Sequence, residues 1–153
     1  MKPHPHRRDQ YFDYSGVVVT LHDMDIYGHL NNNLHHQYFD NAVNRYLSHR
    51  GGLAMRSSPV IGLIVNSGCD YFREVGWPEV EQLDVGIRVN RLGRSSVQYA
   101  GALFIPGDDV AIAQGHLTHV WIDRVTRKPV AIPEAIRAAM EAILVHAHGI
   151  VPA

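Results

Sequence analysis

The segment from His22 to Leu34 reads HDMDIYGHLNNNL and separates two stretches of different periodicity. Before it, Val17-Val18-Val19-Thr20 is rich in β-branched residues, which predicts a first strand at residues 12–21. After it, apolar side chains recur at helical spacing, which predicts a long amphipathic helix whose apolar face carries Leu34, Tyr38, Phe39, Ala42, Val43, Tyr46 and Leu47. The segment is therefore a loop between a strand and a helix, the kind of place where functional side chains concentrate.

The rest of the chain predicts more strands and a second helix. Apolar, β-type runs occupy residues 60–66 (continuing to 72), 83–92, 96–105 and 110–122. The last three are separated by short turn signals, Gly93 and residues 106–109 (PGDD), and such short connections join antiparallel neighbours. Pro133 is expected at the first position of the second helix. This order predicts an α+β fold and disfavours a doubly wound parallel sheet.

Length, charge and cysteine content disfavour several classes of protein. The 153 residues suit one domain, which we place at residues 11–153 behind a flexible N-terminal tail at 1–10. With 14 basic and 15 acidic residues, the chain lacks the global charge that draws proteins to nucleic acid or an anionic membrane. No run approaches the ~20 apolar residues of a membrane span. Residues 1–10 lack the apolar core of a secretory signal, and the single Cys69 excludes an internal disulfide, so we expect a cytoplasmic protein.

The loop carries residue types that suit acyl transfer. The first N–H groups of a helix have no partners within the helix and carry partial positive charge, so they can polarise a carbonyl oxygen. A turn at Gly28 could bring the Asp25 carboxylate near that carbonyl. An ordinary loop with a helix cap needs the same residue types, however. Residue chemistry alone does not choose between the two interpretations.

A family resemblance favours the acyl-transfer interpretation. The run from Asp23 to Asn32 resembles the Asp-x-Asp-x-x-Gly-His-x-Asn-Asn signature of the 4-hydroxybenzoyl-CoA thioesterase-like family of hotdog-fold proteins. The segment from Gln37 to Ala42 resembles the family's helix segment Tyr-Phe-Glu-Glu-Ala. Weaker similarity extends to residues 71–74, 92–97 and 128–133. The chain departs from the family pattern at Asn41, where relatives carry a second glutamate, and at Val43, where many carry arginine.

The resemblance implies a hotdog fold, in which an antiparallel sheet wraps around a long central helix, and a homodimer or homotetramer with active sites between subunits. It implies an acyl-CoA thioesterase acting on acyl-CoA or acyl-ACP, with no cofactor. Asp25 would be the nucleophile or general base, and the Asn32 N–H would polarise the thioester carbonyl. His29 would shape the loop or assist by hydrogen bonding. The turn that carries Arg91, Arg94 and Ser95 would meet the nucleotide end of CoA.

Other functions stay open at this level. The same fold could bind acyl-CoA or acyl-ACP without catalysis, or could serve as a self-associating scaffold. A metal site is disfavoured, although His22, His29, His35 and His36 cluster in sequence. His35 and His36 are neighbours on a helix and point about 100° apart, so they do not readily share one ion. The His-Phe-Pro-Gly motif of dehydratase relatives is missing, which disfavours dehydration.

Overall fold

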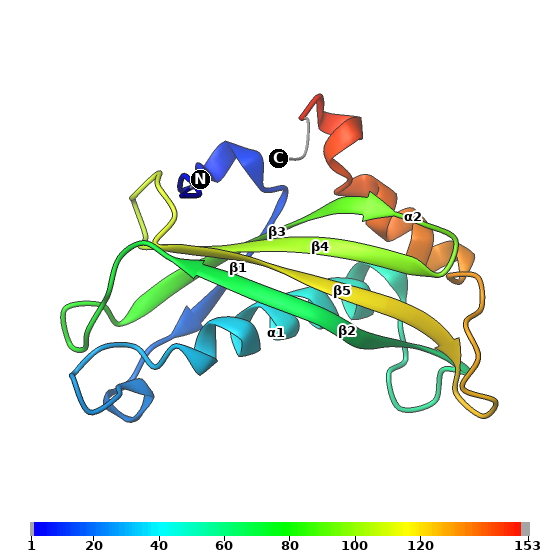
Figure 1. The fold of residues 1–153 in the computed structure, drawn as a ribbon, viewed down its shortest axis with the longest axis horizontal. Coiled ribbons are helices and arrows are strands. Elements are labelled where there is room, and N and C mark those ends of the chain that lie inside the picture. Colours follow the sequence, from blue (N-terminus) through cyan, green and yellow to red (C-terminus); the bar gives the residue numbers. More distant parts are fainter. Residues whose placement is uncertain (1, 151–153) are drawn as a thin grey trace.

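The computed structural model describes residues 2–150, which form one antiparallel sheet, two α-helices and three short 3-10 helices (Figure 1). Along the chain, the strands and helices are β1 (Asp13–Val18), α1 (Asn33–Gly51), β2 (Val60–Tyr71), β3 (Gln82–Leu92), β4 (Ser96–Phe104), β5 (Ala113–Asp123) and α2 (Glu134–Ala142). The strand order across the sheet is β1-β3-β4-β5-β2, and every pairing is antiparallel. Figure 1 shows the curved sheet wrapped over α1. The predicted α+β hotdog fold is therefore confirmed.

Helix α1 begins and ends where the sequence signals it. The helix follows Asn32, and the side chain of Asn31 accepts the otherwise unpaired N–H of Asn33 at 3.1 Å. It ends at Gly51, and the next residue, Gly52, has a left-handed backbone (φ 66°) that suits glycine because no Cβ clashes there. The apolar face predicted from the sequence is buried from Tyr38 to Leu47, and only Leu34 at its start is half-buried.

Phe39 anchors the helix to the middle of the sheet. Its ring is 1% exposed and rests over Gly101 of β4 and Gly115 of β5, which are paired across the two strands. A Cβ on Gly101 would lie 2.5 Å from Phe39 Cδ1, and one on Gly115 would lie 3.0 Å from Phe39 Cε2. The two glycines therefore let α1 approach the sheet more closely than side chains would allow.

Three local expectations differ from the structure. The first strand ends at Val18, because Thr20 already begins a turn in which its N–H donates to Asp23 Oδ2 at 2.7 Å. β5 begins at Ala113 and not at residue 110, because the Ala111 N–H donates to a carbonyl of the N-terminal segment. Pro133 precedes α2 with extended ψ (142°), so the first helical residue is Glu134.

The N-terminal residues pack against the domain, although the sequence predicts a flexible tail at residues 1–10. The His6 N–H donates to Gln114 Oε1 at 2.7 Å, and the Arg8 N–H donates to the Asp109 carbonyl at 3.1 Å. The Arg8 guanidinium also pairs with Asp84 at 2.9 Å. Two of these partners are side chains on β5 and β3, and the third is a backbone carbonyl in the β4–β5 turn, so this segment is tied to the sheet.

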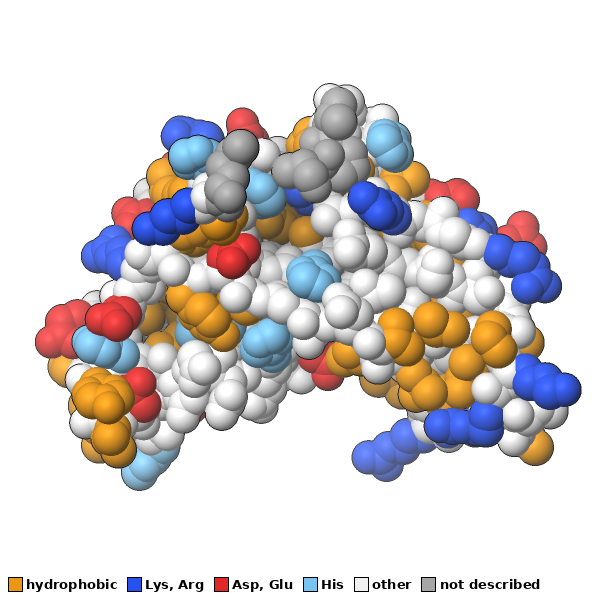
Figure 2. All heavy atoms as spheres, viewed as in Figure 1, with side chains coloured by type: hydrophobic (Ala, Val, Ile, Leu, Met, Phe, Trp, Pro, Cys, Tyr) orange, Lys and Arg blue, Asp and Glu red, His pale blue; other side chains and the backbone are white. Residues whose placement is uncertain are grey.

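Strand β2 forms one edge of the sheet and carries apolar side chains on its exposed part. Leu63, Ile64 and Val65 are 36%, 47% and 60% exposed. Figure 2 shows apolar side chains gathered over the N-terminal half of this strand. An exposed edge of this kind readily pairs with another strand. Within the described residues, no helix has the length and apolar character required to cross a membrane.

Candidate active site

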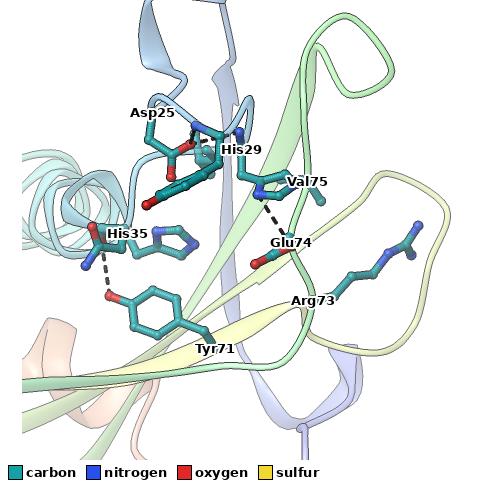
Figure 3. A pocket seen from close by; sticks show the side chains of 10 residues that line it. Asp25, His29, His35, Tyr71, Arg73, Glu74 and Val75 are labelled. Carbon is teal, nitrogen blue, oxygen red and sulfur yellow. Dashed lines mark hydrogen bonds and ion pairs between the residues drawn. The ribbon is translucent and has the colours of Figure 1, made fainter.

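A cavity of about 380 Å³ opens where the loop after β1, the start of α1 and the end of β2 meet (Figure 3). We call it the Asp25 cavity. The residues that line it are Asp25, Tyr27, His29, Leu30, Asn32, His35, Tyr71, Arg73, Glu74 and Val75. The structure thus brings together the three residues that the resemblance assigns to catalysis, Asp25, His29 and Asn32.

Asp25 uses one carboxylate oxygen to hold the loop. Asp25 Oδ1 accepts the N–H of Tyr27 at 2.8 Å and the N–H of His29 at 3.1 Å. The Asp25 N–H in turn donates to the His29 carbonyl at 2.8 Å, across a turn in which Gly28 has φ 80°. Within residues 2–150, Oδ2 has no hydrogen-bond partner. The carboxylate is therefore fixed in orientation, and Oδ2 is left without a partner among these residues.

The start of α1 carries one unpaired N–H, on a residue that lines the same cavity as this carboxylate. The N–H groups of Asn33 and Leu34 are taken by the side chain and carbonyl of Asn31, at 3.1 and 3.0 Å. In the described part of the chain, the Asn32 N–H makes no hydrogen bond, whereas its carbonyl accepts the Tyr71 hydroxyl at 3.0 Å. Because Asn32 sits at the positive end of a 19-residue helix, this peptide group is suited to bind an oxygen that gains negative charge.

His35 is a cavity residue that the sequence suggests only as a candidate metal ligand. It is buried, and its ring packs edge-on against the Tyr71 ring with the centroids 4.7 Å apart. Burial lowers the pKa of His35, although the nearby carbonyls of Asn31 and Asn32 favour the protonated ring. Its position on the first turn of the helix that follows the Asp25 loop is the signal that could have identified it.

The side chain of His29 lies at the mouth of the cavity and faces Glu74. His29 Nδ1 is 3.4 Å from Glu74 Oε2, and both side chains are substantially exposed. Figure 3 shows this pair on the side of the cavity formed by the segment after β2, while Arg73 extends away from Asp25. His29 therefore contacts Asp25 through its backbone N–H, and its ring is placed to meet a ligand at the cavity entrance.

The predicted CoA-binding residues lie elsewhere in the same chain. Arg91, Arg94 and Ser95 are at the β3–β4 turn, at the opposite end of the sheet from the Asp25 cavity (Figure 1). The backbone of this turn is held in place, because the Ser95 carbonyl accepts the Trp121 N–H at 2.7 Å and the Arg94 carbonyl accepts the Ile132 N–H at 2.9 Å. In residues 2–150, neither arginine makes an ion pair.

A metal site has no support in the described residues. No group of three or more histidine, cysteine, aspartate or glutamate side chains there is arranged to hold a metal ion. His35 and His36, which the sequence places side by side, differ in burial: His35 is buried in the cavity wall and His36 is half-buried.

The chain belongs to the thioesterase-like superfamily, whose sequence profile matches residues 19–140. Among solved structures, the PA5185 protein of Pseudomonas aeruginosa strain PAO1 is 46% identical, with a TM-score of 0.88, over 92% of this chain and 96% of that one. PA2801, described as a putative thioesterase of the same species, is 27% identical with a TM-score of 0.73, over 82% of this chain and 95% of that one.

A third structure is described as a thioesterase from Thermus thermophilus complexed with coenzyme A and zinc. It is 26% identical with a TM-score of 0.70, over 85% of this chain and 98% of that one. None of the functionally curated proteins matches this sequence.

Proposed function

We propose that the protein is an acyl-CoA thioesterase that releases a free acid and CoA, with Asp25 as the reacting carboxylate. The observation that carries this proposal is the pairing of a free Asp25 oxygen with an unpaired N–H at the start of α1 in one cavity. Membership of the thioesterase-like superfamily and the coenzyme A complex of the Thermus thermophilus thioesterase support the substrate class.

The chemistry follows from these two groups. The thioester oxygen accepts the Asn32 N–H, which stabilises the negative charge that develops as the carbonyl is attacked. In one route, Asp25 attacks the carbonyl carbon, the C–S bond breaks and water opens the resulting anhydride. In the other route, Asp25 takes a proton from the attacking water, and this proton is then transferred to the departing thiolate. A thiol with a pKa of about 8.5 is a good leaving group, so neither route needs a strong acid.

The edge strand β2 supports assembly into a homodimer. Leu63, Ile64 and Val65 are exposed near the middle of this 12-residue strand, and antiparallel pairing with a second β2 would cover them. Such a two-fold pair would bring the β3–β4 turn of one subunit toward the Asp25 cavity of the other. In this arrangement, the partner subunit's Arg91, Arg94 and Ser95 would meet the CoA phosphates, while acyl-ACP stays the alternative carrier.

The test is thiol release from a panel of acyl-CoAs by the native protein and by Asp25→Asn. The amide oxygen of asparagine can still accept the N–H groups of Tyr27 and His29, so the loop keeps its hydrogen bonds while the reacting carboxylate is lost. We expect kcat/KM to fall by roughly 10²–10⁴-fold, the contribution of a positioned general base.

Asp23→Asn is the matched control. Asp23 lies two residues away, and its Oδ2 accepts the N–H and hydroxyl of Thr20, outside the cavity lining. It should retain activity within a few-fold. Equal losses in the two variants would contradict the assignment of Asp25. Saturable binding of acyl-CoA without turnover by the native protein would instead favour the non-catalytic binder.

A further inference from the structure

A second cavity, of about 390 Å³, lies between the middle of α1, the segment after that helix and the start of β2. We call it the Trp121 cavity. Its wall includes apolar residues from the segment after α1, together with a set of polar residues that the proposed hydrolysis does not use: Asn41, Asn44, His119, Trp121 and Arg124.

Two aromatic rings in this wall have nitrogen atoms without hydrogen-bond partners. Trp121 is 1% exposed and His119 is 2% exposed, and neither Trp121 Nε1 nor His119 Nδ1 has a partner among residues 2–150. Burial lowers the pKa of His119, so its neutral ring offers one donor and one acceptor. The indole N–H can only donate, and a buried donor without an acceptor is unfavourable. A bound oxygen atom would satisfy it.

Gly62 on β2 leaves space next to both rings. A Cβ at this position would lie 3.0 Å from Trp121 Cε2, the ring carbon bonded to Nε1, and 3.2 Å from His119 Nδ1. Any larger residue would fill the part of the cavity beside the two nitrogens. The glycine thus keeps a small recess open there, with aromatic walls and nitrogen atoms at its side.

The rim of the cavity adds positive charge. Arg124 donates through Nε to the Ser58 carbonyl at 2.7 Å and through Nη2 to the Met55 carbonyl at 2.6 Å, which fixes the guanidinium. No carboxylate of the described residues pairs with it. Aromatic walls, an unpaired indole N–H and a fixed guanidinium together suit an apolar group that ends in a hydrogen-bond-accepting oxygen.

On strand β2, the two cavities are lined near opposite ends. Ile61 lines the Trp121 cavity and Tyr71 lines the Asp25 cavity, ten residues along the same strand. At 3.3 Å per residue, these two residues are roughly 33 Å apart along the strand. In a two-fold pair of β2 strands centred near Asn66, however, Ile61 of one subunit lies opposite the partner subunit's Tyr71. Each Trp121 cavity would then adjoin the partner subunit's Asp25 cavity.

We propose that the Trp121 cavity binds the far end of the acyl group whose thioester is held at the partner subunit's Asp25, and that it selects acyl groups ending in an oxygen acceptor. This inference rests on the proposed thioesterase function. It names the substrate class as acyl-CoAs with a distal hydroxyl, keto or carboxylate oxygen. The oxygen accepts the Trp121 N–H, and Gly62 leaves the room for it.

The test compares acyl-CoAs of equal length with and without a distal hydroxyl, keto or carboxylate group. The native protein should show at least about tenfold higher kcat/KM for one of the oxygenated esters, because a site built to hydrogen-bond an oxygen rejects the analogue that lacks it. Trp121→Phe keeps an aromatic ring without the N–H, and Gly62→Ala fills the recess. Both should reduce this preference at least about fivefold, and thermal unfolding verifies that each variant is folded.

Mixed dimers test the contribution of each subunit. A heterodimer of Asp25→Asn and Trp121→Phe chains contains one site with native Asp25 and the native partner's Trp121. It should recover the preference for oxygenated esters, which neither homodimer shows. If the two cavities acted within the same chain, the heterodimer would show no preference for oxygenated esters. That result would overturn the inference that the two subunits share the site.

A binding measurement separates this inference from the proposed function. In a Trp77→Phe background, the fluorescence of Trp121 should change on titration with free ω-hydroxy or ω-keto acids and change much less with the unsubstituted acids. No preference in either binding or kcat/KM, with Asp25→Asn still inactive, would refute the inference alone. Lack of acyl-CoA hydrolysis by the native protein, with selective binding retained, would refute the proposed function and leave the oxygen-binding cavity standing.

Discussion

Replacement of Gly101 by alanine tests whether the contact between Phe39 and the sheet determines the position of α1. The new Cβ would lie 2.5 Å from Phe39 Cδ1, 2.8 Å from Cγ and 3.0 Å from Cε1. Comfortable carbon–carbon contacts are about 3.5–4.0 Å, so the ring or the helix must move by about 1 Å. Because Phe39 is 1% exposed, its ring cannot relieve the contact by turning into solvent. We expect a loss of about 1–3 kcal/mol in the free energy of unfolding.

Urea denaturation at fixed protein concentration measures this loss, since a change in midpoint at constant slope reports stability. Gly16→Ala is the control: its Cβ would meet only the end of the Gln82 side chain, at 3.2 Å, so we expect a change within about 0.5 kcal/mol. A double-mutant cycle with Phe39→Leu should show coupling of about 0.5 kcal/mol or more, because the smaller side chain relieves the clash.

The same displacement should reach the Asp25 cavity, because Phe39 lies one to two turns from the start of α1. A shift of about 1 Å in the Asn32 N–H relative to Asp25 can reduce catalysis by about 10²-fold. Two results would refute the view that this contact positions the helix. One is that the stability losses of Gly101→Ala and Phe39→Leu simply add in the double variant. The other is that Gly101→Ala is as stable as the native protein.

Two further predictions concern the buried histidines and the start of α1. Burial lowers the pKa of His35 and His119 below the ordinary 6.5, so the unfolded chain binds protons more readily. The free energy of unfolding should therefore be highest above about pH 6.5 and fall as the pH drops below it, and His119→Gln should flatten this fall in urea titrations between pH 7 and 5. Tyr71→Phe removes the 3.0 Å hydrogen bond to the Asn32 carbonyl. It should cost at most about 1 kcal/mol of stability, yet lower kcat more than it raises KM; an unchanged kcat would show that the Asn32 peptide needs no such support.

The local parts of the fold and the site could be predicted from the sequence. The periodicity from Leu34 to Leu47 predicts α1 within one residue at its start, and the turn signals at Gly93 and residues 106–109 predict the β3–β4–β5 meander. Asp25, His29 and Asn32 lie within eight residues of one another, so one turn and one helix start are enough to bring them together. These features depend on interactions between near neighbours in the chain.

Only the tertiary structure determines which distant residues join Asp25, His29 and Asn32 at the cavity. His35 and Tyr71 complete the Asp25 cavity only because β2 runs along α1, and the glycine pair under Phe39 becomes visible only when β4 and β5 are in register. His119, Trp121 and Gly62 give no local signal, because strand residues alternate between faces and the sheet pairing selects which ones meet. The motif around Asp25 was thus determined by sequence, whereas the second cavity and the unpaired edge of β2 follow from long-range packing that no local pattern encodes.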